Sequence, residues 1–179
     1  ANPRWFLTQP DRAWGFYGHR LNLYRQTQPH EGFSLMLKWA KETPYFIYTS
    51  NVDGAFQRAG FDDRSIVECH GSIHYLQTLD GSGAPRSADP FTIQVDEEHL
   101  RAHEPLPRDD QGALLRPNIL MFGDWGWDHQ RTQDQENRFD RFLTSVQLDR
   151  VVVIEVGAGT AIPSVRMMGS SLSAQGASL

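Results

Sequence analysis

Two short apolar runs that stop abruptly at polar residues constrain the fold of this chain more than any other feature. The first run, Tyr45–Tyr48, is typical of a buried strand and is followed closely by Asn51 and Asp53. The second run, Ser65–Val67, is followed in the same way by His70. In a parallel sheet, ligand crevices lie outside the carboxyl ends of the strands. The sequence therefore predicts an amide, a carboxylate and an imidazole at one edge of one sheet, where they can form a site.

Helical periodicity between the apolar runs predicts an α/β fold with a mostly parallel sheet flanked by helices. Residues 31–41 carry apolar side chains at i, i+3, i+4 and i+7, as in an amphipathic helix, and Pro44 ends that helix. The apolar run 151–156 is typical of a strand that is covered on both faces. The expected helices are 13–24, 31–41, 55–59 and 136–146, and the expected strands are 45–48, 65–67, 118–122 and 151–156.

Composition narrows the class of protein. The chain has 179 residues and 39% hydrophobic content, which suits one domain with a real core. A formal net charge of −5 argues against nucleic acid or an anionic membrane as partner. The longest purely apolar run, Val151–Ile154, is far shorter than the roughly 20 residues that span a bilayer. A single cysteine, Cys69, excludes an intrachain disulfide and is typical of a reducing compartment, so we expect a cytoplasmic protein.

The motifs around these strand ends resemble those of the sirtuins, the NAD-dependent protein deacylases. Two further blocks in the same order, Arg116–Asp124 and Val151–Pro163, are similar to later sirtuin segments. The resemblance spans most of the chain and implies a Rossmann-like sheet and NAD as cofactor. The residues that match the first two sirtuin blocks are Thr49, Asn51, Val52, Asp53, Ala59, Gly60, Glu68, His70 and Gly71.

The resemblance implies roles for the polar residues at the strand ends. His70 would be the general base, since histidine titrates near neutrality, whereas a lone histidine is otherwise a structural residue. Asn51 and Asp53 would orient the ribose and nicotinamide of NAD, although either side chain could instead cap a helix that begins near Ala55. Ser50 stands where most sirtuins carry a ribose-contacting glutamine, and it is shorter by two bonds.

Two later loops complete the implied site. Gly157, Ala158 and Gly159 would hold NAD, because glycine lets backbone N–H groups approach phosphate or ribose. The segment Phe122, Gly123 and Asp124 would bind the substrate, an acyl-lysine protein or peptide, which pairs as an added strand.

Residues 72–115 differ in composition from the rest and are predicted to form a small inserted module. Many sirtuins hold zinc there on two CxxC pairs, but this chain contains no CxxC, so we expect a zinc-free module and no metal. His99 and His103 have the spacing of a helical metal pair, but a solvated helix is the favoured interpretation. Nothing before Trp14 resembles the glycine-rich start of sirtuins, so residues 1–179 are interpreted as part of a longer catalytic domain with weak or no activity of its own.

Three functions follow from these motifs. The first is NAD-dependent protein-lysine deacylation, with transfer of the acyl group to ADP-ribose. The second is NAD hydrolysis or ADP-ribosyl transfer, which Ser50 and the glycine-alanine-glycine loop keep open. The third is a module that binds NAD or ADP-ribose without turnover.

Overall fold

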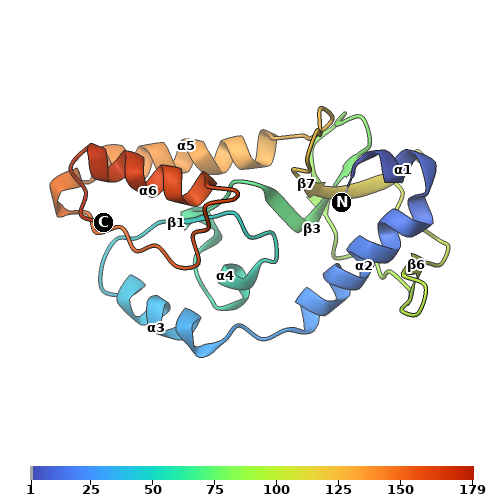
Figure 1. Cartoon of the computed structure of the whole chain (residues 1–179), viewed down its shortest axis with the longest axis horizontal. Coiled ribbons are helices and arrows are strands. Elements are labelled where there is room, and N and C mark those ends of the chain that lie inside the picture. Colours follow the sequence, from blue (N-terminus) through green and yellow to red (C-terminus); the bar gives the residue numbers. More distant parts are fainter. Residues whose placement is uncertain (1) are drawn as a thin grey trace.

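The computed structural model describes residues 2–179 and shows helices and short strands in alternation (Figure 1). Two single 3₁₀ turns, Asp63–Ser65 and Leu148–Arg150, lie between the other elements. The helices are α1 (Arg4–Thr8), α2 (Pro10–Gln26), α3 (Glu31–Ala40), α4 (Ala55–Arg58), α5 (Gln130–Ser145) and α6 (Ser164–Ala174). The strands are β1 (Ile47–Thr49), β2 (Ile66–Glu68), β3 (Gly71–Thr78), β4 (Arg86–Ser87), β5 (Val95–Asp96), β6 (Arg101–Ala102) and β7 (Leu115–Ile119).

The strands form three small sheets. β1 and β2 pair in parallel, β4, β3 and β7 form an antiparallel sheet in that order, and β5 pairs antiparallel with β6. The α/β class is confirmed, but the parallel part of the predicted sheet is confined to β1 and β2. These two strands are joined through α4, and parallel strands need such a crossover. β3 and β7 are joined through residues 79–114, which contain no helix, and they pair antiparallel.

The larger hydrophobic cluster lies where α1 and α2 pack beside β3, β7 and the short strands between them (Figure 1). Ile73 and Leu76 of β3 are fully buried in it, so the predicted module 72–115 begins inside the core. The indole Nε1 of Trp14 donates a 2.9 Å hydrogen bond to the carbonyl of Leu115. This contact ties α2, longer than its predicted range, to the start of β7.

The second cluster joins β2 to α5 and α6, which lie at the other end of the molecule (Figure 1). α5 begins at Gln130 rather than at the predicted residue 136, because its first turns are buried through polar contacts. The Thr132 hydroxyl donates to the carbonyl of Glu68 at 3.1 Å, and the Glu68 amide donates to Gln135 Oε1 at 3.0 Å. A search for apolar periodicity does not detect a buried face of this kind.

The predicted strand 151–156 is wrong. The segment is extended but makes a single bridge, between Val152 and Ser178. Its alternate side chains point outward: Val152, Ile154 and Val156 are 70%, 62% and 71% exposed. Without a second strand along its length, the apolar run has no ladder to join. The other predicted helices and strands exist, with their ends shifted by a few residues.

Candidate functional site

The parallel pairing of β1 and β2 brings the two predicted strand ends together. Thr49 lies opposite Glu68 in the register, and the Cys69 amide donates to the Thr49 carbonyl at 2.9 Å. The chain therefore leaves both strands at the same edge, with Ser50 beside His70. This is the arrangement that the strand-end pattern predicts.

His70 is partly buried and is contacted from two sides. Its Nε2 lies 3.1 Å from the hydroxyl of Ser164, the first residue of α6, and the Ser50 backbone lies beside its ring. Burial lowers the pKa of His70 below its usual range, and the Ser50 carbonyl opposes this effect. The imidazole is therefore neutral near pH 7, in the form that can accept a proton.

The loop between β1 and α4 holds the other two predicted polar residues. The side chain of Asn51 is exposed, and its backbone N–H donates to Thr49 Oγ1 at 3.1 Å. One carboxylate oxygen of Asp53 accepts a 2.9 Å hydrogen bond from the Ala55 amide at the start of α4. Gly54 is the N-cap of α4 and no side chain caps that helix, so Asp53 makes this local bond to the first helical amide without taking the cap position considered for it. The loop is also tied to β3, whose Ile73 amide donates to the Val52 carbonyl at 2.9 Å.

The glycine loop reaches His70 only indirectly. Gly157 and Gly159 are exposed, and nothing lies within 4 Å of a Cβ placed at either position. Arg166 of α6 donates to the Ala158 carbonyl at 3.2 Å. Because α6 also carries Ser164, this helix is the link between the loop and His70.

The segment after β7 divides into an exposed and a buried part. Phe122 is 78% exposed and Trp125 is fully exposed, whereas the side chains of Arg116 and Asp124 are 1% and 2% exposed. Two guanidinium nitrogens of Arg116 donate to the two carboxylate oxygens of Asp124, at 2.7 and 2.9 Å. The carboxylate of Asp124 is therefore engaged in a buried ion pair, and Phe122 and Gly123 form the accessible part of the predicted substrate segment.

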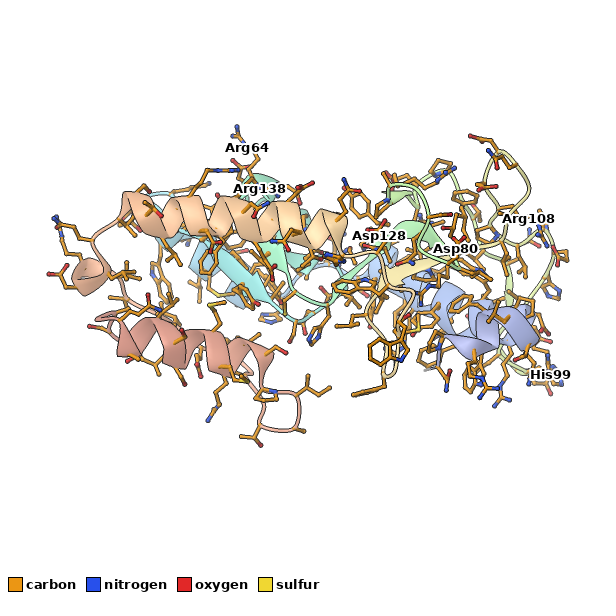
Figure 2. All side chains as sticks on the ribbon, turned by 90° about the horizontal axis from the view of Figure 1, so that it is seen from above. Arg64, Asp80, His99, Arg108, Asp128 and Arg138 are labelled. Carbon is orange, nitrogen blue, oxygen red and sulfur yellow. The ribbon has the colours of Figure 1, made fainter. Side chains whose placement is uncertain are left out.

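His99 and His103, for which a solvated helix was the favoured interpretation, do not lie on a helix in the structure. His99 Nδ1 lies 2.8 Å from Asp96 in the connection between β5 and β6, which is not helical, at the opposite end of the molecule from α5 and α6 (Figure 2). Within residues 2–179, no three His, Cys, Asp or Glu side chains are grouped to hold a metal ion. No helix in that range is long and apolar enough to cross a membrane.

Sequence reasoning missed several residues that shape the site. Ser164 lies 94 positions from His70, and nothing in their spacing points to this contact. His74 contacts the backbone of Asp53, but its spacing gives no sign of this. The pairing of Arg116 with Asp124, eight positions apart, follows neither helical nor strand spacing.

Comparisons with known proteins identify the family to which this chain belongs. The Sir2 family model matches residues 1–149, most of the chain. An NAD-dependent protein deacylase of Aquifex aeolicus is 29% identical over 130 residues, which are 69% of this chain and 48% of that protein. An NAD-dependent protein deacylase of Mycobacterium tuberculosis is 31% identical over 120 residues, 66% of this chain and 47% of that protein. The chain thus spans about half the length of these curated relatives.

Solved structures agree on the fold. A crystal structure of a Sir2 homologue in complex with NAD superposes with a TM-score of 0.66 at 22% identity, covering 98% of this chain and 61% of that one. A Sir2 protein bound to a propionylated peptide superposes with a TM-score of 0.60 at 18% identity, covering 97% and 66%. At such identities the likeness supports the fold alone, and the match to the family model carries the assignment. The chain belongs to the Sir2 family, the sirtuins.

Proposed function

We propose that this chain forms part of an NAD-dependent protein-lysine deacylase. The observation that carries the proposal is the parallel pairing of β1 with β2, which sets the loop 51–53 beside a neutral His70. Family membership supports NAD as the cosubstrate and an acyl-lysine side chain as the acyl donor. Deacylation would then consume NAD and leave the acyl group on ADP-ribose.

The groups around His70 suit NAD chemically. The exposed amide of Asn51, the hydroxyl of Ser50 and the carboxylate of Asp53 can bond ribose hydroxyls and a carboxamide. The open backbone at Gly157 and Gly159 leaves room for a ribose or phosphate group. We therefore assign NAD binding to Ser50, Asn51, Asp53 and the loop 157–159. When bound, NAD supplies the ribose carbon that the acyl oxygen attacks as nicotinamide leaves.

The chain's own residues would act on protons and position. His70 would take the proton of a ribose hydroxyl through its neutral imidazole. Phe122 and Gly123 would bind the acyl-lysine peptide by strand addition. Asp124 would contribute by fixing that segment through Arg116, since its carboxylate is already engaged.

Ser50 favours a second candidate reaction. Its side chain is shorter than the glutamine at this place in most sirtuins, so one contact to the ribose is lost or passes through water. A less ordered intermediate would react more readily with water, and NAD hydrolysis or ADP-ribosyl transfer is the alternative activity. NAD or ADP-ribose binding without turnover is the third.

We also propose that residues 1–179 belong to one catalytic domain in which 72–115 is a zinc-free module. The single cysteine suits this proposal and a cytoplasmic location. Elemental analysis of chelator-treated protein that found stoichiometric zinc would contradict it.

Nicotinamide release from NAD by the full-length protein that contains this chain, measured with and without an acetyl-lysine peptide, tests the function. Release that requires the peptide supports deacylation, and equal release without it supports NAD hydrolysis. If the folded full-length protein binds NAD without any release, the binding module is the remaining function.

The His70→Ala variant should lose about 10²–10⁴-fold in acyl transfer, the usual effect of removing a general base, and should keep most of its NAD affinity. His103→Ala is the matched control, because this exposed histidine lies outside the site. Equal effects of the two substitutions on acyl transfer would rule out His70 as the base.

A further inference from the structure

The backbone carbonyl oxygen of Asp53 accepts two side-chain hydrogen bonds. Arg58 Nη1, from the last residue of α4, donates to it at 2.7 Å, and His74 Nε2, from β3, lies at 2.9 Å. A carbonyl oxygen has two lone pairs, so both of its acceptor positions are occupied. The two donors come from different elements and therefore hold this peptide group from two directions.

The protonation of His74 fits the role of a donor. Burial lowers its pKa most, the Asp53 carbonyl opposes this, Arg58 and Arg25 lower it further, and Glu68 opposes them. A neutral imidazole carries one N–H, and the Asp53 carbonyl assigns that hydrogen to Nε2. Arg58 Nη1 also lies 3.4 Å from His74 Nε2. This is a contact between two donors that share one acceptor, the Asp53 carbonyl oxygen.

The backbone at Gly54, the residue after Asp53, is closely packed. Gly54 has a φ of +67°, in the left-handed region, and a Cβ built there would lie 2.7 Å from His74 Cδ2. The imidazole is therefore packed directly against the backbone that follows Asp53. On the other side, the Val52 carbonyl is bonded to the Ile73 amide. Backbone contacts and side chains together fix the peptide groups on both sides of Asp53.

We infer that His74 and Arg58 form a clamp that positions the loop 51–53 for NAD, an inference that rests on the proposed function. Both are positioning residues, because they act through the Asp53 backbone. The clamp fixes the orientation of the Asp53–Gly54 peptide before NAD arrives. Pre-organisation of this kind strengthens binding because less loop ordering remains to be done on association.

Steady-state kinetics of nicotinamide release separates the clamp from a general loss of structure. His74→Leu should raise KM for NAD about three- to tenfold, the factor that one neutral hydrogen bond contributes, and leave KM for an acetyl-lysine peptide unchanged. His74→Gln should restore most of the NAD affinity, because its amide N–H can donate to the same carbonyl. His103→Leu is the control for the same chemical change at an exposed position. Equal KM values for NAD in His74→Leu and the wild type would overturn the inference.

Hydrogen–deuterium exchange tests the clamp without any catalysis. In the absence of NAD, His74→Leu and Arg58→Met should speed exchange in a peptide covering residues 49–55 by about three- to tenfold, with little change in α5. Arg4→Met, at an exposed position, controls for the loss of an arginine. Unchanged exchange in residues 49–55 would overturn the clamp. A full-length wild-type protein that neither binds NAD nor releases nicotinamide would overturn the proposed function, while this measurement still decides the clamp.

Discussion

Replacing Asp124 by alanine should destabilise the protein severely, because the substitution leaves Arg116 charged and buried. The two side chains are 1% and 2% exposed and share two hydrogen bonds. Within residues 2–179, the Nε of Arg116 is buried without a hydrogen-bond partner, and its other contact is with Met121 Sδ at 3.9 Å, a weak acceptor. Asp124 is the one carboxylate paired with Arg116 in the described part of the chain.

The size of the effect follows from the burial. Removing one partner of a buried ion pair costs about 3–5 kcal/mol, because an uncompensated charge remains in the interior. For a chain of this length that corresponds to a fall in Tm of about 6–20 °C. Replacing both residues by apolar ones, as in Arg116→Met with Asp124→Leu, should recover most of the loss, since no buried charge remains.

Urea unfolding followed by circular dichroism measures these free energies. Asp110→Ala is the control, because Asp110 pairs with Arg86 at the surface and exposed pairs contribute little to stability. If Asp124→Ala kept the stability of the wild type and instead raised KM for the peptide, the carboxylate would be a substrate ligand and the structural argument would be refuted. A double variant as unstable as Asp124→Ala would also contradict it.

Three further outcomes follow from the site and the sheet. Burial raises the pKa of the Cys69 thiol to about 11, so at pH 8 it should react with a disulfide reagent roughly a hundredfold more slowly than in urea. The pKa of His74 is lowered in the folded protein, so as the pH falls the unfolded chain binds a proton at this residue before the folded chain does. The contribution of His74 to the free energy of unfolding should therefore be complete above about pH 6.5 and be lost below it. His74→Leu should reduce this pH dependence when the free energy is measured by urea titration. Gly71→Ala should abolish soluble expression, because a Cβ at φ +76° would overlap a backbone carbonyl of β7; Gly83→Ala, at φ +77° in open space, should fold with a loss of about 1–2 kcal/mol.

The strand ends could be predicted from the sequence because they depend on local information. An apolar run that stops at a polar residue marks both a buried strand and its exit from the sheet, as at Thr49 and Glu68. Amphipathic periodicity identified α3 for the same reason. The run 151–156 has the composition of a strand as well, but a strand also needs a partner, and composition does not supply one.

The contacts that hold the site could not be predicted, because they join residues that are distant along the chain. Burial of Glu68 depends on Arg131, Thr132 and Gln135, all on the polar face of α5. Those side chains look like a solvated surface in the sequence. Their burial becomes visible only once β2 and α5 are packed together, and the same holds for the contact of Ser164 with His70.

The segment 151–156 has a consequence for how the protein behaves at high concentration. Glu155, its single charged residue, faces Gly169 of α6, so the outward row of Val152, Ile154 and Val156 carries no charge. An exposed apolar row of this kind is a surface on which a second copy of the chain can pack. Self-association should therefore begin at this row, and a lysine in place of Ile154 should raise solubility without touching the core.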